Sequence, residues 1–214
     1  MTDPGFHRFI DEMKDKLSLP LPGLESQMRM ATMKRILRKG QVDVPEDARK
    51  AGVLIMFYSR NGEVHIPFIK RNEYPGVHSG QVSFPGGGWE KDDKDITATA
   101  LRETEEEIGV KRNLVTAIGT LTNLYIPPSN FLVTPVVAYM DGQPEFKPDP
   151  DEVDRILEVP LKELVMPGAI QEKEITIFPD VRLKVPCFYI EEQVIWGATA
   201  MMLCELVDII SPGS

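Results

Sequence analysis

The sequence is poor in the side chains that build thiolate, disulfide and histidine sites. Its 214 residues include two cysteines and three histidines. Cys187 and Cys204 lie far apart and form no Cys-x-x-Cys pair, which predicts two reduced core thiols and argues against a disulfide framework or a zinc-thiolate site. His7, His65 and His78 are scattered rather than clustered, so a metal centre built from histidines is not expected.

Positive charge and long hydrophobic runs are also scarce. Lys and Arg number 24 against 33 Asp and Glu, which gives a formal net charge of −9. General nucleic-acid binding relies on cations that neutralise phosphates, so it is disfavoured. No stretch has the length of a transmembrane helix, the N-terminus lacks the apolar core of a signal peptide, and the C-terminal Ser-Pro-Gly-Ser is no peroxisomal signal. We therefore predict a cytoplasmic protein without a membrane partner.

The composition fits a globular protein that alternates helices and strands. Hydrophobic residues make up 42% of the chain and charged residues 27%, values typical of a domain with one sizeable core. Apolar spacing predicts an amphipathic helix over 5–17 and a second helical stretch near 25–38. Farther along, the pattern predicts strands at 52–58, 63–70, 113–125, 131–140 and around 174–190, helices at 96–108, near 152–157, at 160–165 and from about 196, and a turn-rich connection over 142–151.

The most informative segment is an acidic helix behind a run of glycines. Pro85-Gly-Gly-Gly88 precedes a predicted helix that ends at Gly109, a left-handed cap. At 100° per residue, Glu103, Glu106 and Glu107 fall on one side of this helix, where their mutual repulsion would be costly. An ordinary solvated acidic face would not explain the glycines upstream. A divalent cation would relieve the repulsion, so we predict a metal site.

Arg-Glu-x-x-Glu-Glu-x-Gly after a Gly-Gly turn resembles the signature of the Nudix hydrolases, which cleave nucleoside diphosphates linked to another moiety. Arg102 through Val110 match the second half of that signature, with Thr104 at a position that is usually apolar. The first half departs from it. Lys94 stands where a glutamate is usual, and the loop is one residue longer than usual if Gly87 opens it, or regular if Gly88 does. Acidic residues remain nearby at Glu90, Asp92 and Asp93.

The resemblance implies a set of metal ligands and catalytic residues. Glu106 and Glu107 are the leading ligands, Glu103 completes the set, and the Gly87 carbonyl is a further candidate. Oxygen ligands of this kind suit Mg²⁺ or Mn²⁺, which neutralise a diphosphate and activate water. Arg102 is suited to orienting a carboxylate by paired hydrogen bonds. Glu152 is a candidate further ligand or general base from a loop beyond the box, although an exposed or helix-capping carboxylate explains it as well. Which carboxylate is the base stays open.

Residues 66–87 resemble the additional motif of the coenzyme A diphosphatase branch of that family. The stretch also reads as a buried strand followed by a turn-rich loop, and the two interpretations are compatible. Asn72 and Gly76 depart from the motif, which expects a second arginine five residues after the first. That arginine would suit the 3′-phosphate of coenzyme A, so Lys70, Arg71 or a residue elsewhere must supply the contact. The resemblance implies the following substrate-binding residues: Arg71, His78, Ser79, Gly80, Gln81, Phe84 and Gly86.

The C-terminal half resembles the same branch in the order and spacing of Thr134-Pro135, Asp151-Glu152-Val153, Val159-Pro160-Leu161 and Trp196-Gly197. The implied fold is α/β: a Nudix-type α/β/α sandwich with a mixed β-sheet and an N-terminal helical extension. We divide the chain into that extension, residues 1–48, packed on the domain, and the Nudix domain, residues 49–214.

The implied function is metal-dependent hydrolysis of the diphosphate of coenzyme A or acyl-CoA, which gives 4′-phosphopantetheine and adenosine 3′,5′-bisphosphate. Another nucleoside diphosphate derivative, such as NADH or ADP-ribose, is an alternative substrate. A non-catalytic nucleotide-binding module is a further alternative, although all three box glutamates are present. The expected partner is a small nucleotide, and the protein is expected to be a monomer or a homodimer.

Overall fold

The computed structural model describes residues 3–32, 43–73, 79–178 and 181–211. Its helices are α1 (Pro4–Leu17), α2 (Leu24–Met28), α4 (Ile96–Ile108), α5 (Leu161–Val165) and α6 (Gly197–Ile210). Its strands are β1 (Arg49–Arg60), β2 (Glu63–Arg71), β3 (Val82–Ser83), β4 (Gly86–Gly88), β5 (Val115–Thr120), β6 (Leu124–Ile126), β7 (Phe131–Met140), β8 (Val153–Pro160), β9 (Ile170–Phe178), β10 (Val181–Ile190) and β11 (Gln193–Ile195). Two short 3-10 turns occupy Arg112–Leu114 and Pro127–Ser129.

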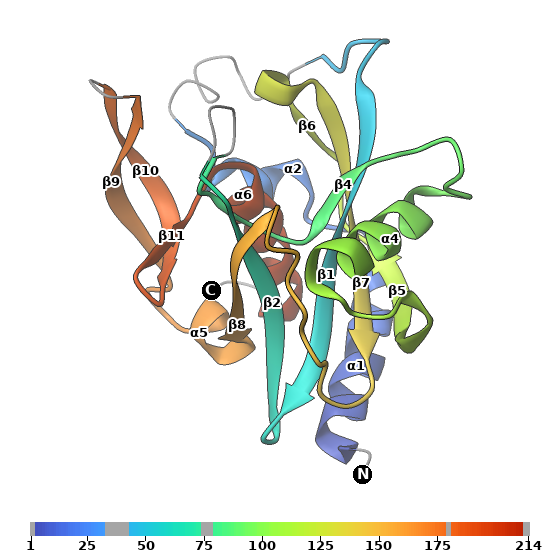
Figure 1. Ribbon diagram of the computed structural model, residues 1–214. Helices are drawn as coiled ribbons and strands as arrows, with labels where there is room; N and C mark the ends of the chain where they lie inside the picture. Colours follow the sequence, from blue (N-terminus) through green and yellow to red (C-terminus); the bar gives the residue numbers. More distant parts are fainter. Residues whose placement is uncertain (1–2, 33–42, 74–78, 179–180, 212–214) are drawn as a thin grey trace.

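Eight strands form a mixed sheet around the long strand β1 (Figure 1). The main order is β3-β2-β1-β7-β5, and β4, β6 and β8 pair with β1, β7 and β2 respectively. β1 and β7 are parallel, whereas every other pair in this sheet is antiparallel. β9, β10 and β11 form a second, three-stranded antiparallel sheet. The β1 register places the glycines of β4 beside the N-terminal half of β1.

Helices cover both faces of the main sheet (Figure 1). Alternate residues of β1 point to opposite faces: Ala51, Ile55 and Phe57 join the core shared with α1 and α6, whereas Leu54 and Met56 join the core beneath α4. α1 and α4 each bury one face against the sheet, whereas α6 is buried on almost all sides. The predicted α/β/α sandwich with a mixed sheet is confirmed.

The N-terminal helices are attached to the sheet and α6 by apolar contacts and a buried polar group. Phe6, Ile10 and Met13 of α1 are buried in the core shared with α6. Gln27 of α2 donates to the fully buried Glu205 of α6 over 2.8 Å. The proposed boundary between residues 48 and 49 stays a prediction. Within the described ranges, no helix combines the length and apolar character needed to cross a membrane.

Several predicted elements are confirmed and others were wrong. The strands predicted at 52–58 and 63–70 lie within β1 and β2, Cys187 and Cys204 are buried free thiols, and α4 ends at Gly109 with a left-handed φ of +74°. The helix predicted near 152–157 is instead strand β8, because these residues pair with β2. The single strand predicted at 113–125 is divided into β5 and β6. Of the helix predicted at 25–38, residues 25–28 belong to α2 and residues 29–32 are not helical. Residues 33–38 lie outside the described residues.

Candidate active site

The site begins where the glycine loop runs beside the start of β1. Gly86, Gly87 and Gly88 pair with Val53, Gly52 and Ala51 respectively. The chain then turns back into α4, where the Asp95 carboxylate caps the helix by accepting a hydrogen bond from the Ala98 N–H over 2.9 Å. The strand pairing and the cap together hold the acidic face of α4 against the glycine backbone.

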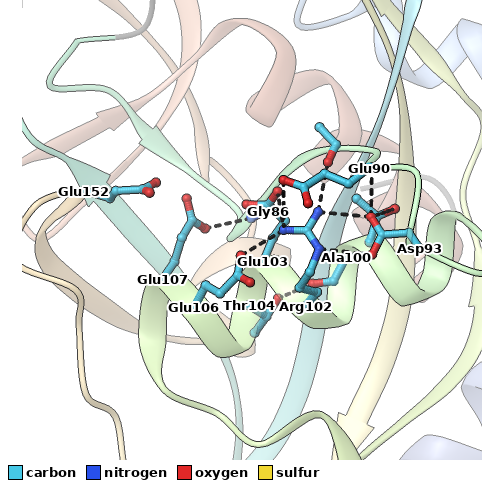
Figure 2. A network of polar contacts seen from close by, with 12 residues as sticks. Gly86, Glu90, Asp93, Ala100, Arg102, Glu103, Thr104, Glu106, Glu107 and Glu152 are labelled. Atoms are coloured by element: carbon cyan, nitrogen blue, oxygen red, sulfur yellow. Dashed lines mark hydrogen bonds and ion pairs between the residues drawn. The ribbon is translucent and has the colours of Figure 1, made fainter.

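The three box glutamates differ sharply in exposure although they share one helix face (Figure 2). The Glu107 side chain is 2% exposed, that of Glu103 is 16% exposed and that of Glu106 is 54% exposed. Glu103 and Glu106 share Arg102 as a partner, whereas Glu107 contacts the Gly86 N–H and Arg71. Glu107, the most buried of the three, is therefore the glutamate whose charge depends most on neighbouring protein groups.

Arg102 organises the far side of this face. Its Nε and Nη2 atoms each lie 3.0 Å from one carboxylate oxygen of Asp93, and Nη2 also donates to the Gly88 carbonyl over 3.0 Å. Its Nη1 atom lies 3.0 Å from Glu103 and 2.8 Å from Glu106 (Figure 2). One guanidinium thus ties the glycine loop, the connecting loop and the acidic helix together.

Lys94 stands at the motif position where a glutamate is usual, but its neighbour Asp93 supplies the carboxylate that pairs with Arg102. The Asp93 carboxylate also accepts hydrogen bonds from the Glu90 N–H and the Thr99 hydroxyl, over 3.0 and 2.9 Å. Hydrogen bonding to Arg102 lowers the pKa of Asp93 well below its usual range. The Asp93 side chain is shorter than the usual glutamate and lies one residue earlier. It reaches Arg102 because the loop brings the Asp93 backbone close to that arginine. The sequence showed an acidic loop, but spacing alone did not select Asp93.

Glu107 is held by residues from the preceding motif. One of its oxygens accepts the Gly86 N–H over 2.8 Å, and the other lies 3.3 Å from Arg71 Nη1. Burial nevertheless raises the pKa of Glu107 to about 7, with smaller opposing contributions from the Gly86 N–H and Arg71. Its ionised form is costly unless more positive charge is added at this position.

Glu103 lies directly over the glycine backbone. A Cβ atom on Gly87 would come within 2.6 Å of all three atoms of the Glu103 carboxyl group, so only glycine leaves room for this carboxylate at its present position. Burial raises the pKa of Glu103, and the neighbouring Arg102 opposes that increase.

The predicted substrate segment reaches the site only in part. Arg71 lies between Glu107 and Glu152, with Nη2 3.9 Å from Glu152. Ser79, Gly80 and Gln81 are half-exposed on the returning chain, whose Gln81 carbonyl accepts the Arg71 N–H over 3.0 Å. His78 and Gly76 lie outside the described residues.

Two members of that segment serve the fold instead. Phe84 is 1% exposed and stacks on Phe68 with ring centroids 4.8 Å apart, so its side chain lies in the core, and its predicted place in the substrate site stays a prediction. Asn72, which directly follows Arg71, donates to the Pro150 carbonyl over 2.8 Å, and its N–H donates to the Glu152 carbonyl over 3.1 Å. It anchors the loop that carries Glu152.

The donor chemistry suits a hard divalent cation. Six carboxylates (Glu90, Asp93, Glu103, Glu106, Glu107 and Glu152) surround two guanidinium groups (Arg71 and Arg102), which leaves an excess of negative charge. Oxygen ligands and open positions for water are what Mg²⁺ prefers. Among the described residues, no group of three Asp, Glu, His or Cys side chains already converges on one point. The exposed Glu106 side chain would have to turn from Arg102 to complete a ligand set.

Comparison with known proteins gives a family match over most of the chain. Residues 48–181 match the family model described as the NUDIX domain. A mouse protein named peroxisomal coenzyme A diphosphatase NUDT7 is 36% identical over 60% of this chain and 54% of its own length. An uncharacterized Nudix hydrolase, NudL of Pectobacterium atrosepticum, is 37% identical over 63% of this chain and 69% of its own. This chain thus matches only about half the length of the mouse relative.

A solved structure of similar shape accompanies these sequence matches. The MutT protein from Methanosarcina mazei Go1 aligns with 78% of this chain and 96% of its own, with a TM-score of 0.49 and 16% identity. The assignment to a family comes from the sequence match, which also covers the glycine loop, α4 and the loop that carries Glu152.

Proposed function

Because the chain belongs to the Nudix hydrolase family, we propose that it hydrolyses the diphosphate of coenzyme A or acyl-CoA. The products would be 4′-phosphopantetheine, or its acyl form, and adenosine 3′,5′-bisphosphate. The observation that carries this proposal is the meeting of two motifs at Glu107. The box supplies the carboxylate, while Arg71 and the Gly86 N–H come from the segment that resembles the coenzyme A motif. The name of the mouse relative supports the same substrate class.

We assign the metal to the box carboxylates. Glu103, Glu106 and Glu107 would hold Mg²⁺ or Mn²⁺, with the Gly87 carbonyl as a further ligand. When bound, such an ion neutralises the diphosphate and lowers the pKa of a bound water. It would also stabilise the ionised form of Glu107, whose pKa burial has raised to about 7.

The chain's own residues position these groups. Arg102, fixed by two hydrogen bonds to Asp93, holds Glu103 and Glu106 over the glycine loop. Arg71 lies between Glu107 and Glu152 and supplies positive charge near the substrate's phosphates. Glu152 is 53% exposed, so it is free to accept a proton from water or to join the ligand set. Distinguishing these two roles requires kinetics.

A second substrate class has one observation in its favour. Gly76 stands five residues after Arg71, where the motif expects the second arginine, so this position brings no charge to a 3′-phosphate. A dinucleotide without that phosphate, such as NADH or ADP-ribose, would need no such charge. The cytoplasmic location and the monomeric or dimeric state remain predictions.

The decisive experiment is a substrate panel. The protein is incubated with Mg²⁺ and coenzyme A, acetyl-CoA, NADH, ADP-ribose or nucleoside triphosphates, and the products are separated by mass. We expect the largest kcat/KM for coenzyme A or its acyl form, with adenosine 3′,5′-bisphosphate among the products. Faster turnover of ADP-ribose or NADH would reject the coenzyme A assignment. Measurable nucleotide affinity without any hydrolysis would favour a binding module.

A further inference from the structure

Three cations close to the box glutamates, Arg71, Arg102 and Lys70, are engaged by carboxylates. Arg71 contacts Glu107 and Glu152, and Arg102 contacts Asp93, Glu103 and Glu106. The Lys70 ammonium lies 3.3 Å from Asp154. A substrate with a further phosphate beyond its diphosphate is best matched by positive charge that no carboxylate already neutralises.

Arg49, the first residue of β1, differs from these cations. Its guanidinium carbon lies 4.0 Å from the centroid of the Phe131 ring, and its Nη2 atom donates to the Ser129 carbonyl over 2.9 Å. Within the described part of the chain, no carboxylate lies at ion-pair distance from it; Asn130 contacts the nearby Asp47 instead. The ring and the carbonyl orient the guanidinium, and its other N–H groups remain available to an anion.

The sheet places this guanidinium close to the glycine loop. Arg49 pairs with Phe131 across β1 and β7, and Ala51 pairs with Gly88 across β1 and β4. The Phe131 ring lies 3.6 Å from the Cβ position of Gly88, whose carbonyl accepts a hydrogen bond from Arg102. β4 and β7 both pair with residues 51–53 of β1, so two strand spacings, about 10 Å in all, separate their backbones. In adenosine 3′,5′-bisphosphate one ribose separates the two phosphate positions, a span of this order.

We propose that Arg49, stacked on Phe131, binds the 3′-phosphate of the adenosine nucleotide and so sets the preference for coenzyme A over substrates that lack this group. The inference rests on the proposed function for its substrate. A planar guanidinium offers paired N–H donors to a phosphate, and its stacking on an aromatic ring limits the side-chain entropy lost on binding.

The test compares coenzyme A with 3′-dephospho-coenzyme A, which differ only in this phosphate. In Arg49→Gln we expect kcat/KM for coenzyme A to fall at least tenfold more than kcat/KM for the dephospho form. Arg49→Lys keeps the charge but loses the planar guanidinium. Its ratio of kcat/KM for coenzyme A to kcat/KM for the dephospho form should lie between the ratios of the wild type and Arg49→Gln. Arg182→Gln, a change to an exposed arginine of β10 paired with Glu174, is the matched control and should leave the substrate ratio unchanged. An equal fall for both substrates, or no fall, would overturn the proposal.

A binding measurement separates this inference from the proposed function. Calorimetry with Mg²⁺ compares adenosine 3′,5′-bisphosphate with 5′-AMP on the wild-type protein and on Arg49→Gln. We expect the bisphosphate to bind at least tenfold tighter to the wild type, and the variant to lose most of that difference. If the wild type hydrolyses neither coenzyme A nor its dephospho form, the proposed function fails. The affinities for the two nucleotides would still test whether Arg49 binds the 3′-phosphate. Equal affinity for the two nucleotides would overturn the role of Arg49.

Discussion

At the scale of single residues, Glu107 combines deep burial with a predicted place in the metal site. Its pKa is raised to about 7, chiefly by burial, whereas an unfolded chain would ionise near 4.5. The folded state therefore binds one more proton than the unfolded state between these values. Without metal, the contribution of Glu107 to stability is therefore most favourable below about pH 4.5, falls as the pH rises from there to about 7, and stays constant above that.

Glu107→Gln should remove this dependence. In the presence of a chelator at pH 8, we expect the free energy of unfolding of the variant to exceed that of the wild type by about 1–3 kcal/mol, while activity with Mg²⁺ falls at least about a hundredfold because a ligand is lost. Urea unfolding at pH 5 and pH 8 and initial rates measure both effects. Glu105→Gln, on the same helix but paired with Lys111 and Arg112, is the control. Unchanged turnover in Glu107→Gln would reject the assigned ligand.

Asp93 gives the second residue-scale prediction. Asp93→Asn removes a carboxylate that is 6% exposed and leaves Arg102 without its paired acceptor, so we expect a loss of about 3 kcal/mol in the free energy of unfolding at pH 7. The lowered pKa means that this stabilisation is complete above the unfolded value of 3.8 and is lost as the pH falls toward the folded value.

The control for Asp93 is its neighbour. Lys94→Gln should change unfolding and kcat little, because the ion pair to Arg102 comes from residue 93. Chemical unfolding and kcat are measured for both variants. A larger effect from residue 94 than from residue 93 would contradict the pairing.

At the scale of elements, the packing of α4 on β1 depends on Gly52. A Cβ atom at this position would come 2.6 Å from the Ile96 carbonyl oxygen and 3.2 Å from the Ala100 nitrogen. Gly52→Ala should push the helix from the sheet, with a loss of about 1–3 kcal/mol in stability and a lower kcat, because the carboxylates move with the helix. Gly142→Ala has open space but a φ of +85°, so it should cost about 1 kcal/mol through strain alone and leave kcat unchanged. Equal kcat for the two variants would argue against the contact.

The element boundaries show what local sequence can predict. The α4 prediction, Ile96–Ile108, succeeded because its apolar period, Asp95 cap and Gly109 stop all act within a few residues. The β8 prediction failed because residues 153–160 become a strand through pairing with β2, a contact between segments more than 80 residues apart. Strand formation depends on such neighbours more than on intrinsic preference.

At the scale of the whole molecule, the N-terminal helices complete the core on the α6 face. Ile10 of α1 is 1% exposed in that core, so Ile10→Ala should lower the free energy of unfolding by about 2–5 kcal/mol through loss of apolar contact and a residual cavity. Arg8→Ala, on the exposed side of the same helix, should change it by less than about 0.5 kcal/mol. Thermal unfolding measures both. Equal stabilities would contradict the prediction that residues 1–48 pack on the domain.

The family, the fold class and the acidic face of α4 could be predicted from the sequence because they depend on residues close together in the chain. Helical periodicity places Glu103, Glu106 and Glu107 on one side, and the glycine run marks the loop before them. The partners of these glutamates required the tertiary structure. Whether Asp93 or Lys94 meets Arg102 depends on the path of the loop before α4, and Phe84 lies in the core because its ring stacks on Phe68 of β2. Arg49 lies near the glycine loop because β4 and β7 both pair with β1. Loop path and strand register are set by contacts outside the local sequence, which is the physical reason that spacing alone could not decide them.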